Sequence, residues 1–166
     1  MAENMQSEIE SKNESLLQFL TFTLENEVFG FDVEQVKEIL EFQRPVKVPL
    51  TPDYLAGVIN LRGTIIPVID LKRKFELKLT EEAGEEIIIV VDMIFEGEEF
   101  IYGILADSVK EVMDMPSSLI EDPPKIGANY KASLLKGVGK SESGIIMLLD
   151  VEKIVNSINM SIGDEK

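Results

Sequence analysis

The stretch IIPVIDL, residues 65–71, returns 80 positions later as IIMLLDV, residues 145–151. More matches lie in the same order: GV at 57–58 with GV at 137–138, FGF at 29–31 with YGI at 102–104, and VKEI at 36–39 with VKEV at 109–112. Strands can resemble one another by chance, but strand composition does not require the shared Gly, Lys, Glu and Asp. The sequence therefore predicts a duplicated unit, with a seven-residue insertion in the second copy.

Each copy follows one plan: a hairpin, a short helix, a second hairpin and a short terminal helix. A copy of about 70 residues suits a small closed barrel without exposed sheet edges. Because copies this small hold little core alone, we expect each copy to form one lobe and the lobes to share an apolar seam. The domain then spans residues 16–158, with copies at 16–80 and 86–158, between flexible tails at 1–15 and 159–166.

Alternating and β-branched runs predict the strands of these hairpins. The predicted strands are residues 16–24, 27–32, 58–61, 64–69, 87–95, 100–105 and 144–149. Val33, Val36, Ile39 and Leu40 fall on helical spacing, which predicts a short helix, and a similar pattern predicts another at 151–158. Arg62-Gly63 is typical of a two-residue hairpin turn with positive φ at Gly63. The acidic segment 80–86 is a predicted linker.

The composition excludes several classes of function. The 166 residues carry a formal net charge of -15, which disfavours binding to nucleic acid and to anionic membranes. The sequence contains neither Cys nor His, which excludes thiol nucleophiles, disulfides, His-ligated metals and a phospho-accepting His. It has no run of about 18 apolar residues and no secretory signal, so a cytoplasmic location is expected.

Three motifs with a catalytic appearance have simpler interpretations. Gly139-Lys140-Ser141 resembles the end of a phosphate-binding loop, but Leu134 replaces the required Gly and a strand follows, which favours a hairpin. Asp70 and Asp150 each follow an apolar strand, where a helix N-cap explains them better than paired catalytic acids. The acidic residues of segment 80–86 match no Ca²⁺ loop, so no metal and no cofactor are predicted.

Arg62 is the strongest candidate for a binding residue. It is the sole charge between Tyr54 and Asp70, at the tip of an apolar hairpin. A solvated turn residue is one interpretation, and an Arg anchor beside an exposed apolar patch is the other, since Arg is enriched at binding hot spots. Glu38, on the polar side of the predicted helix, can pair with it. Apolar residues at the margin of that helix can line a groove between the lobes, suited to receive a helix.

A longer block extends this hairpin in both directions. The block LAGVINLRGTIIPVIDL, residues 55–71, resembles the signature of the CheW family, the chemotaxis coupling proteins. Weaker matches follow in order: FTL at 22–24, FGF at 29–31, VKEI at 36–39, ADSV at 106–109 and MLLD at 147–150. The resemblance covers about residues 16–158, which is nearly the whole chain.

The resemblance implies a mainly β fold of two five-stranded SH3-like β-barrel lobes around a shared apolar core, with short helices. It implies a non-enzymatic adaptor, without a cofactor, that joins transmembrane chemoreceptors to the histidine kinase CheA. The helical tip of the receptor would bind in the groove between the lobes. The regulatory domain of CheA, which has the same fold, would pair through unlike lobes, and further copies of the coupling protein can join such arrays.

Site residues carry over by their positions in these motifs. Glu38 and Arg62 match positions tied to receptor and kinase coupling, while Val33, Val36 and Ile39 match the apolar lining. Gly57 and Gly63 belong to the matching block, and Ile126 lies where the family places an apolar contact to the kinase. The counterpart of the Arg62 turn in the second copy is Glu142-Ser143, so one lobe alone is expected to carry this anchor.

Two other classes of protein remain as alternatives. The chain can be a regulatory module of a larger chemotaxis kinase or of a coupling protein fused to a receiver, although no kinase or receiver sequence is left over. It can also be an enzyme that uses Asp or Glu, which would require two acids to converge in one pocket. No segment is predicted to assemble such a pair.

Overall fold

Eleven strands and four short helical segments make up the described part of the computed structural model, which comprises residues 16–77, 86–123, 133–142 and 144–164. The strands are β1 (Leu16–Leu24), β2 (Glu27–Asp32), β3 (Val36–Glu41), β4 (Leu55–Leu61), β5 (Thr64–Asp70), β6 (Ile87–Phe95), β7 (Glu98–Ala106), β8 (Ser108–Pro116), β9 (Ile120–Glu121), β10 (Leu135–Ser141) and β11 (Gly144–Leu149). The helical segments are η1 (Val33–Gln35), α2 (Leu71–Lys74), η2 (Ser117–Leu119) and α3 (Val151–Asp164). The mainly β prediction is confirmed, whereas α3 extends past residue 158, where the sequence placed the start of a tail.

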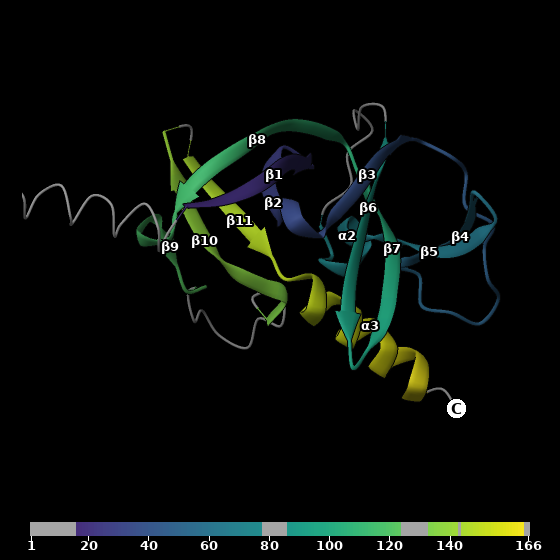
Figure 1. Ribbon diagram of the computed structural model, residues 1–166. Coiled ribbons are helices and arrows are strands. Elements are labelled where there is room, and N and C mark those ends of the chain that lie inside the picture. The colour runs from purple at the N-terminus through teal and green to yellow at the C-terminus, as the bar shows by residue number, and fades with distance from the viewer. Residues whose placement is uncertain (1–15, 78–85, 124–132, 143, 165–166) are drawn as a thin grey trace, which may run out of the picture.

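The strands form two sheets, and each sheet is one lobe of the molecule (Figure 1). The order is β8-β1-β2-β11-β10-β9 in the six-stranded lobe and β3-β6-β7-β5-β4 in the five-stranded lobe. The prediction that each copy forms its own lobe is wrong. The first hairpin of each copy, β1–β2 or β6–β7, is inserted between strands of the other copy. Both lobes therefore depend on both halves of the chain.

The exchange preserves the duplication. In one lobe Gly30 of β2 pairs in parallel with Leu148 of β11, and in the other Gly103 of β7 pairs in parallel with Val68 of β5. Matched residues thus occupy matched positions in unlike lobes. The two lobes are related by pseudo-symmetry, so the features that they do not share can be identified position by position.

Each sheet is closed by the chain that follows its edge strand. In the five-stranded lobe, Val46 returns to exchange two backbone hydrogen bonds with Val58 of β4, at 2.8 and 2.9 Å. In the six-stranded lobe the two-residue strand β9 pairs with β10 in the same way. Gly57 allows the first crossing: it has φ +143°, and a Cβ there would lie 2.7 Å from the carbonyl carbon of Val46. Gly137 allows the second, since a Cβ there would lie 2.9 Å from the carbonyl oxygen of Glu121.

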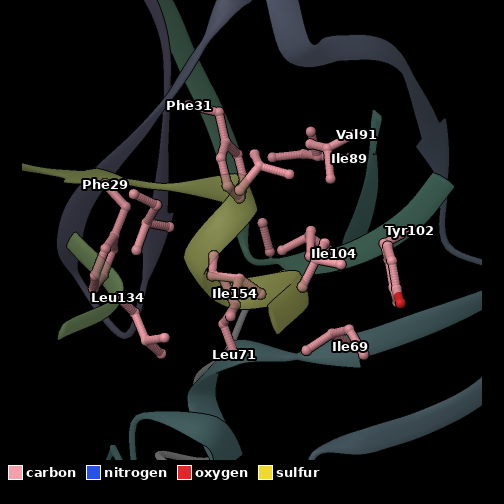
Figure 2. Close-up of a cluster of buried hydrophobic side chains, with 14 of the residues drawn as sticks. Phe29, Phe31, Ile69, Leu71, Ile89, Val91, Tyr102, Ile104, Leu134 and Ile154 are labelled. Atoms are coloured by element: carbon pink, nitrogen blue, oxygen red, sulfur yellow. The ribbon is translucent and has the colours of Figure 1, made fainter. Parts of the chain in front are cut away.

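Strands that bury both faces give the molecule three apolar clusters. One fills the five-stranded lobe around Ile88 and Val90, and a second fills the six-stranded lobe around Phe19 and Leu148. The third and largest lies between the lobes and includes residues of both sheets and of α3 (Figure 2). The shared apolar core is thus confirmed. Since alternate residues of β6 enter different clusters, its sequence is a continuous apolar run.

The predicted helix at residues 33–40 is wrong. Only Val33–Gln35 form a short 3₁₀ turn, and Val36–Glu41 is the edge strand β3. Its pairing with β6 skips Lys37, because Val36 lies opposite Val91 and Glu38 lies opposite Val90. This β-bulge places Val36 and Ile39 on one face of the strand, and the i, i+3 spacing that results imitates a helix. The counterpart strand β8 has the same bulge, at Lys110.

The two repeated aspartates cap helices, as predicted. Asp70 Oδ1 accepts a hydrogen bond from the Arg73 N–H at 3.3 Å, and Asp150 Oδ1 accepts one from the Lys153 N–H at 3.2 Å. Gly139–Ser141 lie at the end of β10, which agrees with the hairpin interpretation. In the described ranges, no helix has both the length and the apolar character needed to cross a membrane.

Candidate partner-binding site

The Arg62 turn joins β4 to β5 at the end of the five-stranded lobe. Arg62 and Gly63 both have positive φ, 49° and 89°, as a two-residue hairpin loop of the primed type requires. The side chain of Asn60 braces the turn, because its Oδ1 accepts a hydrogen bond from the Gly63 N–H at 2.8 Å. The hairpin prediction is confirmed, although positive φ occurs at Arg62 as well as at Gly63.

Glu38 binds the guanidinium of Arg62 with both carboxylate oxygens. Arg62 Nη1 donates to Glu38 Oε1 at 3.1 Å, and Nη2 donates to Oε2. The hydrogen bond from Arg62 lowers the pKa of Glu38, and the same contact raises the pKa of Arg62. The predicted pair is therefore present, on a strand rather than on a helix. The side chain of Arg62 remains 70% exposed, so the pair leaves most of the guanidinium surface open to a partner.

Apolar side chains line part of the pocket beside this ion pair, together with Lys37 and Thr64. The pair borders a pocket of about 230 Å³ whose other walls include Leu61, Ile66 and Ile101. Ile65, three residues beyond Arg62, is 61% exposed. A cation beside partly exposed apolar side chains is a combination that protein interfaces favour. Sequence reasoning missed Ile65, although its outward position follows from the alternation along β5.

The three valine and isoleucine positions differ in what they offer to a partner. Val33 and Val36 are half-buried and pack against the cluster between the lobes. Ile39 lies on the same face of β3 as Val36 but is 46% exposed. Its counterpart in the other lobe, Val112 on β8, is 56% exposed. Ile39 can therefore contact a partner directly, whereas Val33 and Val36 anchor this part of the chain to the apolar cluster between the lobes.

The remaining predicted site residues have other positions. Gly57 lies under the chain crossing at Val46, which gives it a structural role. Gly63 is open, with nothing within 4 Å of a Cβ built there, and serves the turn. Ile126 lies outside the described residues.

The six-stranded lobe lacks the anchor, as the sequence predicts. Glu111 occupies the position of Glu38, and Glu142 occupies the position of Arg62. Both line an open pocket of about 580 Å³ with Met113 and Leu119. This end is acidic, so the two lobes present ends of different charge. Across the described ranges, no three acidic side chains gather in a way that could hold a metal ion.

Comparisons with known proteins agree with this architecture. The CheW-like domain family matches residues 18–159. A chemotaxis protein CheW from Klebsiella aerogenes is 33% identical over 147 residues, covering 89% of this chain and 86% of that protein. A chemotaxis protein CheW from Treponema pallidum is 32% identical over 146 residues, covering 87% of this chain and 85% of that protein.

A solved structure is also similar to this chain. The crystal structure of the scaffolding protein TtCheW from Thermoanaerobacter tengcongensis superimposes with a TM-score of 0.71 at 31% sequence identity, covering 81% of this chain and 84% of that one. The family match spans most of the chain, and the similarity of fold is accompanied by substantial sequence identity. This chain therefore belongs to the CheW-like family.

Proposed function

We propose that this protein is a non-enzymatic chemotaxis adaptor that links transmembrane chemoreceptors to the histidine kinase CheA. Membership of the CheW-like family and the names of its relatives support this role. In this proposal the protein acts in the cytoplasm and is recruited to the inner face of the membrane through receptors. It has no chemistry of its own and biases the kinase between active and inactive states through differential contacts.

The observation that carries the proposal is the Arg62–Glu38 pair. A bidentate ion pair exposed at the tip of a rigid hairpin contributes little to folding, because solvent screens it. Its orientation is nevertheless fixed, since Asn60 braces the turn and Glu38 holds the guanidinium. An oriented cation beside the half-buried Leu61 and Ile101, which line the same pocket, is suited to recognition.

The two partners would use different surfaces. The exposed Ile39 on β3, beside the seam between the lobes, offers an apolar contact for the helical tip of a receptor. The ends of the lobes, which differ in charge, suit the regulatory domain of CheA if it pairs through unlike lobes. Head-to-tail pairing of this kind can close into rings or extend into an array, and it would admit further copies of the adaptor.

Replacing Arg62 with alanine should reduce receptor-dependent kinase activation by about tenfold, because it removes a fixed cation from the binding surface. The unfolding midpoint should stay close to that of the parent protein, since the side chain is largely solvent-exposed. The measurement is ATP turnover in a reconstituted mixture of receptor, kinase and adaptor. Lys136→Ala is the matched control. Lys136 lies in the six-stranded lobe, has a side chain that is 43% exposed, and forms an ion pair with Asp32 of the same lobe at 3.6 Å.

A charge swap separates recognition from a purely local role. Glu38→Arg combined with Arg62→Glu keeps the intramolecular ion pair but reverses its direction. If partners bind the cation at residue 62, the swapped protein should show the same reduction in kinase activation as Arg62→Ala. Full activity of either protein would mean that Arg62 is only a turn residue.

A further inference from the structure

Three charged side chains are buried together at the junction of the two lobes. Glu25, Lys72 and Asp107 have side chains that are 8%, 9% and 11% exposed. Lys72 Nζ lies 2.9 Å from Glu25 Oε1 and 2.5 Å from Asp107 Oδ1. Asp107 Oδ2 also accepts a hydrogen bond from the Glu25 N–H at 2.8 Å. We call these three residues the Lys72 cluster.

Each member of the Lys72 cluster comes from a different part of the fold. Glu25 is at the tip of the β1–β2 hairpin in the six-stranded lobe. Lys72 is on α2, directly after β5 of the five-stranded lobe. Asp107 is the single residue between β7 and β8, where the chain passes from one lobe to the other, and its N–H donates to the Thr23 carbonyl at 2.9 Å. The cluster therefore joins both lobes and the crossover between them.

Pseudo-symmetry shows that the fold does not require this cluster. The counterpart of Lys72 on α3 is Glu152, the counterpart of Asp107 is Glu34, and the matching hairpin tip carries Glu96. All three glutamates are exposed, so none of these counterparts places a buried charge at the equivalent junction. A buried ion cluster is also an inefficient source of stability, because desolvation offsets much of the attraction.

The contacts within the Lys72 cluster depend on orientation, whereas the apolar packing between the lobes does not. Apolar packing between the lobes is non-directional, so it opposes separation more than small rotations. Charge-assisted hydrogen bonds have defined lengths and angles, and two of them meet here, from Lys72 to Glu25 and from the Glu25 N–H to Asp107, beside the ion pair of Lys72 with Asp107. A rotation of either lobe would break at least one of them in a site sheltered from water.

We propose that the Lys72 cluster is a positioning element that fixes the orientation of one lobe relative to the other. This orientation sets the spacing between surfaces on different lobes, so the cluster determines how strongly binding at one surface affects a partner at the other. The second statement rests on the proposed adaptor function. The first concerns the fold alone and can be tested without any partner.

The test replaces all three residues by neutral ones of similar shape: Glu25→Gln, Lys72→Met and Asp107→Asn. The amide oxygen introduced at position 107 would still accept from the N–H of residue 25, and no charge would remain unpaired. Glu152→Gln is the matched control, because it produces the same change in net charge at the exposed counterpart of Lys72. Asp107→Asn alone is a milder second variant in case the triple variant fails to fold.

Orientation is measured by spin labels, which the absence of native Cys makes simple. Cysteines at Glu98 in one lobe and Lys110 in the other, both exposed, give one distance between the lobes. The proposal predicts a broader distance distribution in the triple variant than in the parent and in Glu152→Gln. An unchanged distribution in the triple variant would overturn it.

Coupling is measured with the same variants. The triple variant should bind a receptor tip fragment and a CheA regulatory domain with affinities within roughly twofold of the parent, yet activate the kinase at least about fivefold less. Parent-like activation would contradict the proposal. If the parent itself fails to activate the kinase, the proposed function fails, and the distance distribution alone then decides whether the cluster positions the lobes.

Discussion

Replacing Gly57 with alanine should lower the free energy of unfolding by roughly 2–5 kcal/mol. The residue lies where the chain closes the five-stranded lobe, at φ +143°, a conformation that residues with side chains rarely adopt. A Cβ would also lie 2.7 Å from the Val46 carbonyl carbon and 3.0 Å from Pro45 Cβ. The backbone must move to relieve both contacts, which would weaken the paired hydrogen bonds between Val46 and Val58. Urea denaturation followed by circular dichroism measures the loss.

Gly97→Ala is the control for the backbone term alone. Gly97 has φ +78° in the β6–β7 turn, but nothing lies within 4 Å of a Cβ built there. The Gly97→Ala variant should lose about 1 kcal/mol of its free energy of unfolding, the ordinary cost of alanine at positive φ. Equal losses at positions 57 and 97 would show that the crossing at Val46 is not tight.

Replacing Lys72 alone with methionine should be as damaging, at about 3–5 kcal/mol. This single change removes the cation of the Lys72 cluster and leaves two carboxylates, Glu25 and Asp107, in a site that is at most 11% exposed. The neutral triple variant avoids this penalty because it removes the carboxylate charges as well. The comparison of the two in thermal unfolding separates the cost of unpaired charge from the role of the cluster in orientation. A single variant as stable as the parent would contradict the buried-charge argument.

The pH dependence of the parent protein gives an independent check on Lys72. Burial disfavours its charged form, but the hydrogen bonds and charges of Asp107 and Glu25 outweigh burial, so the pKa of Lys72 is raised in the folded protein. The unfolded value is about 10.4. The contribution of Lys72 is then fully present below that pH and is lost as pH rises through the folded pKa. Lys72→Met should lack this alkaline component in its stability profile.

The sequence predicts the hairpins well because strand alternation and turn chemistry are local. It predicts the wrong element at residues 33–40 because one bulged residue, Lys37, turns a strand period into an apparent helical one. It also misassigns the lobes, since a repeat shows that two segments share a structure but not which segment each will pair with. The exchange of the β1–β2 and β6–β7 hairpins is decided by the core between the lobes, which is a property of the assembled chain.

The candidate site also combines features that local sequence predicts with features that depend on the assembled chain. The Arg62–Glu38 pair is predictable because a lone charge at an apolar turn has few uses, and the pair is present in the structure. The Lys72 cluster is not, because its members are 47 and 82 positions apart and each has an ordinary polar neighbourhood in the sequence. The role of Gly57 is also hidden, since the close approach of Val46 depends on closure of the barrel.

In the proposed function, this chain has separate surfaces for two protein partners. NMR shift mapping of the isotope-labelled chain, titrated first with a receptor tip fragment and then separately with a CheA regulatory domain, tests it most directly. We expect two distinct sets of shifted residues, with the receptor set centred on Ile39 and its neighbours on β3. A single shared set, or no shifts with either partner, would contradict it.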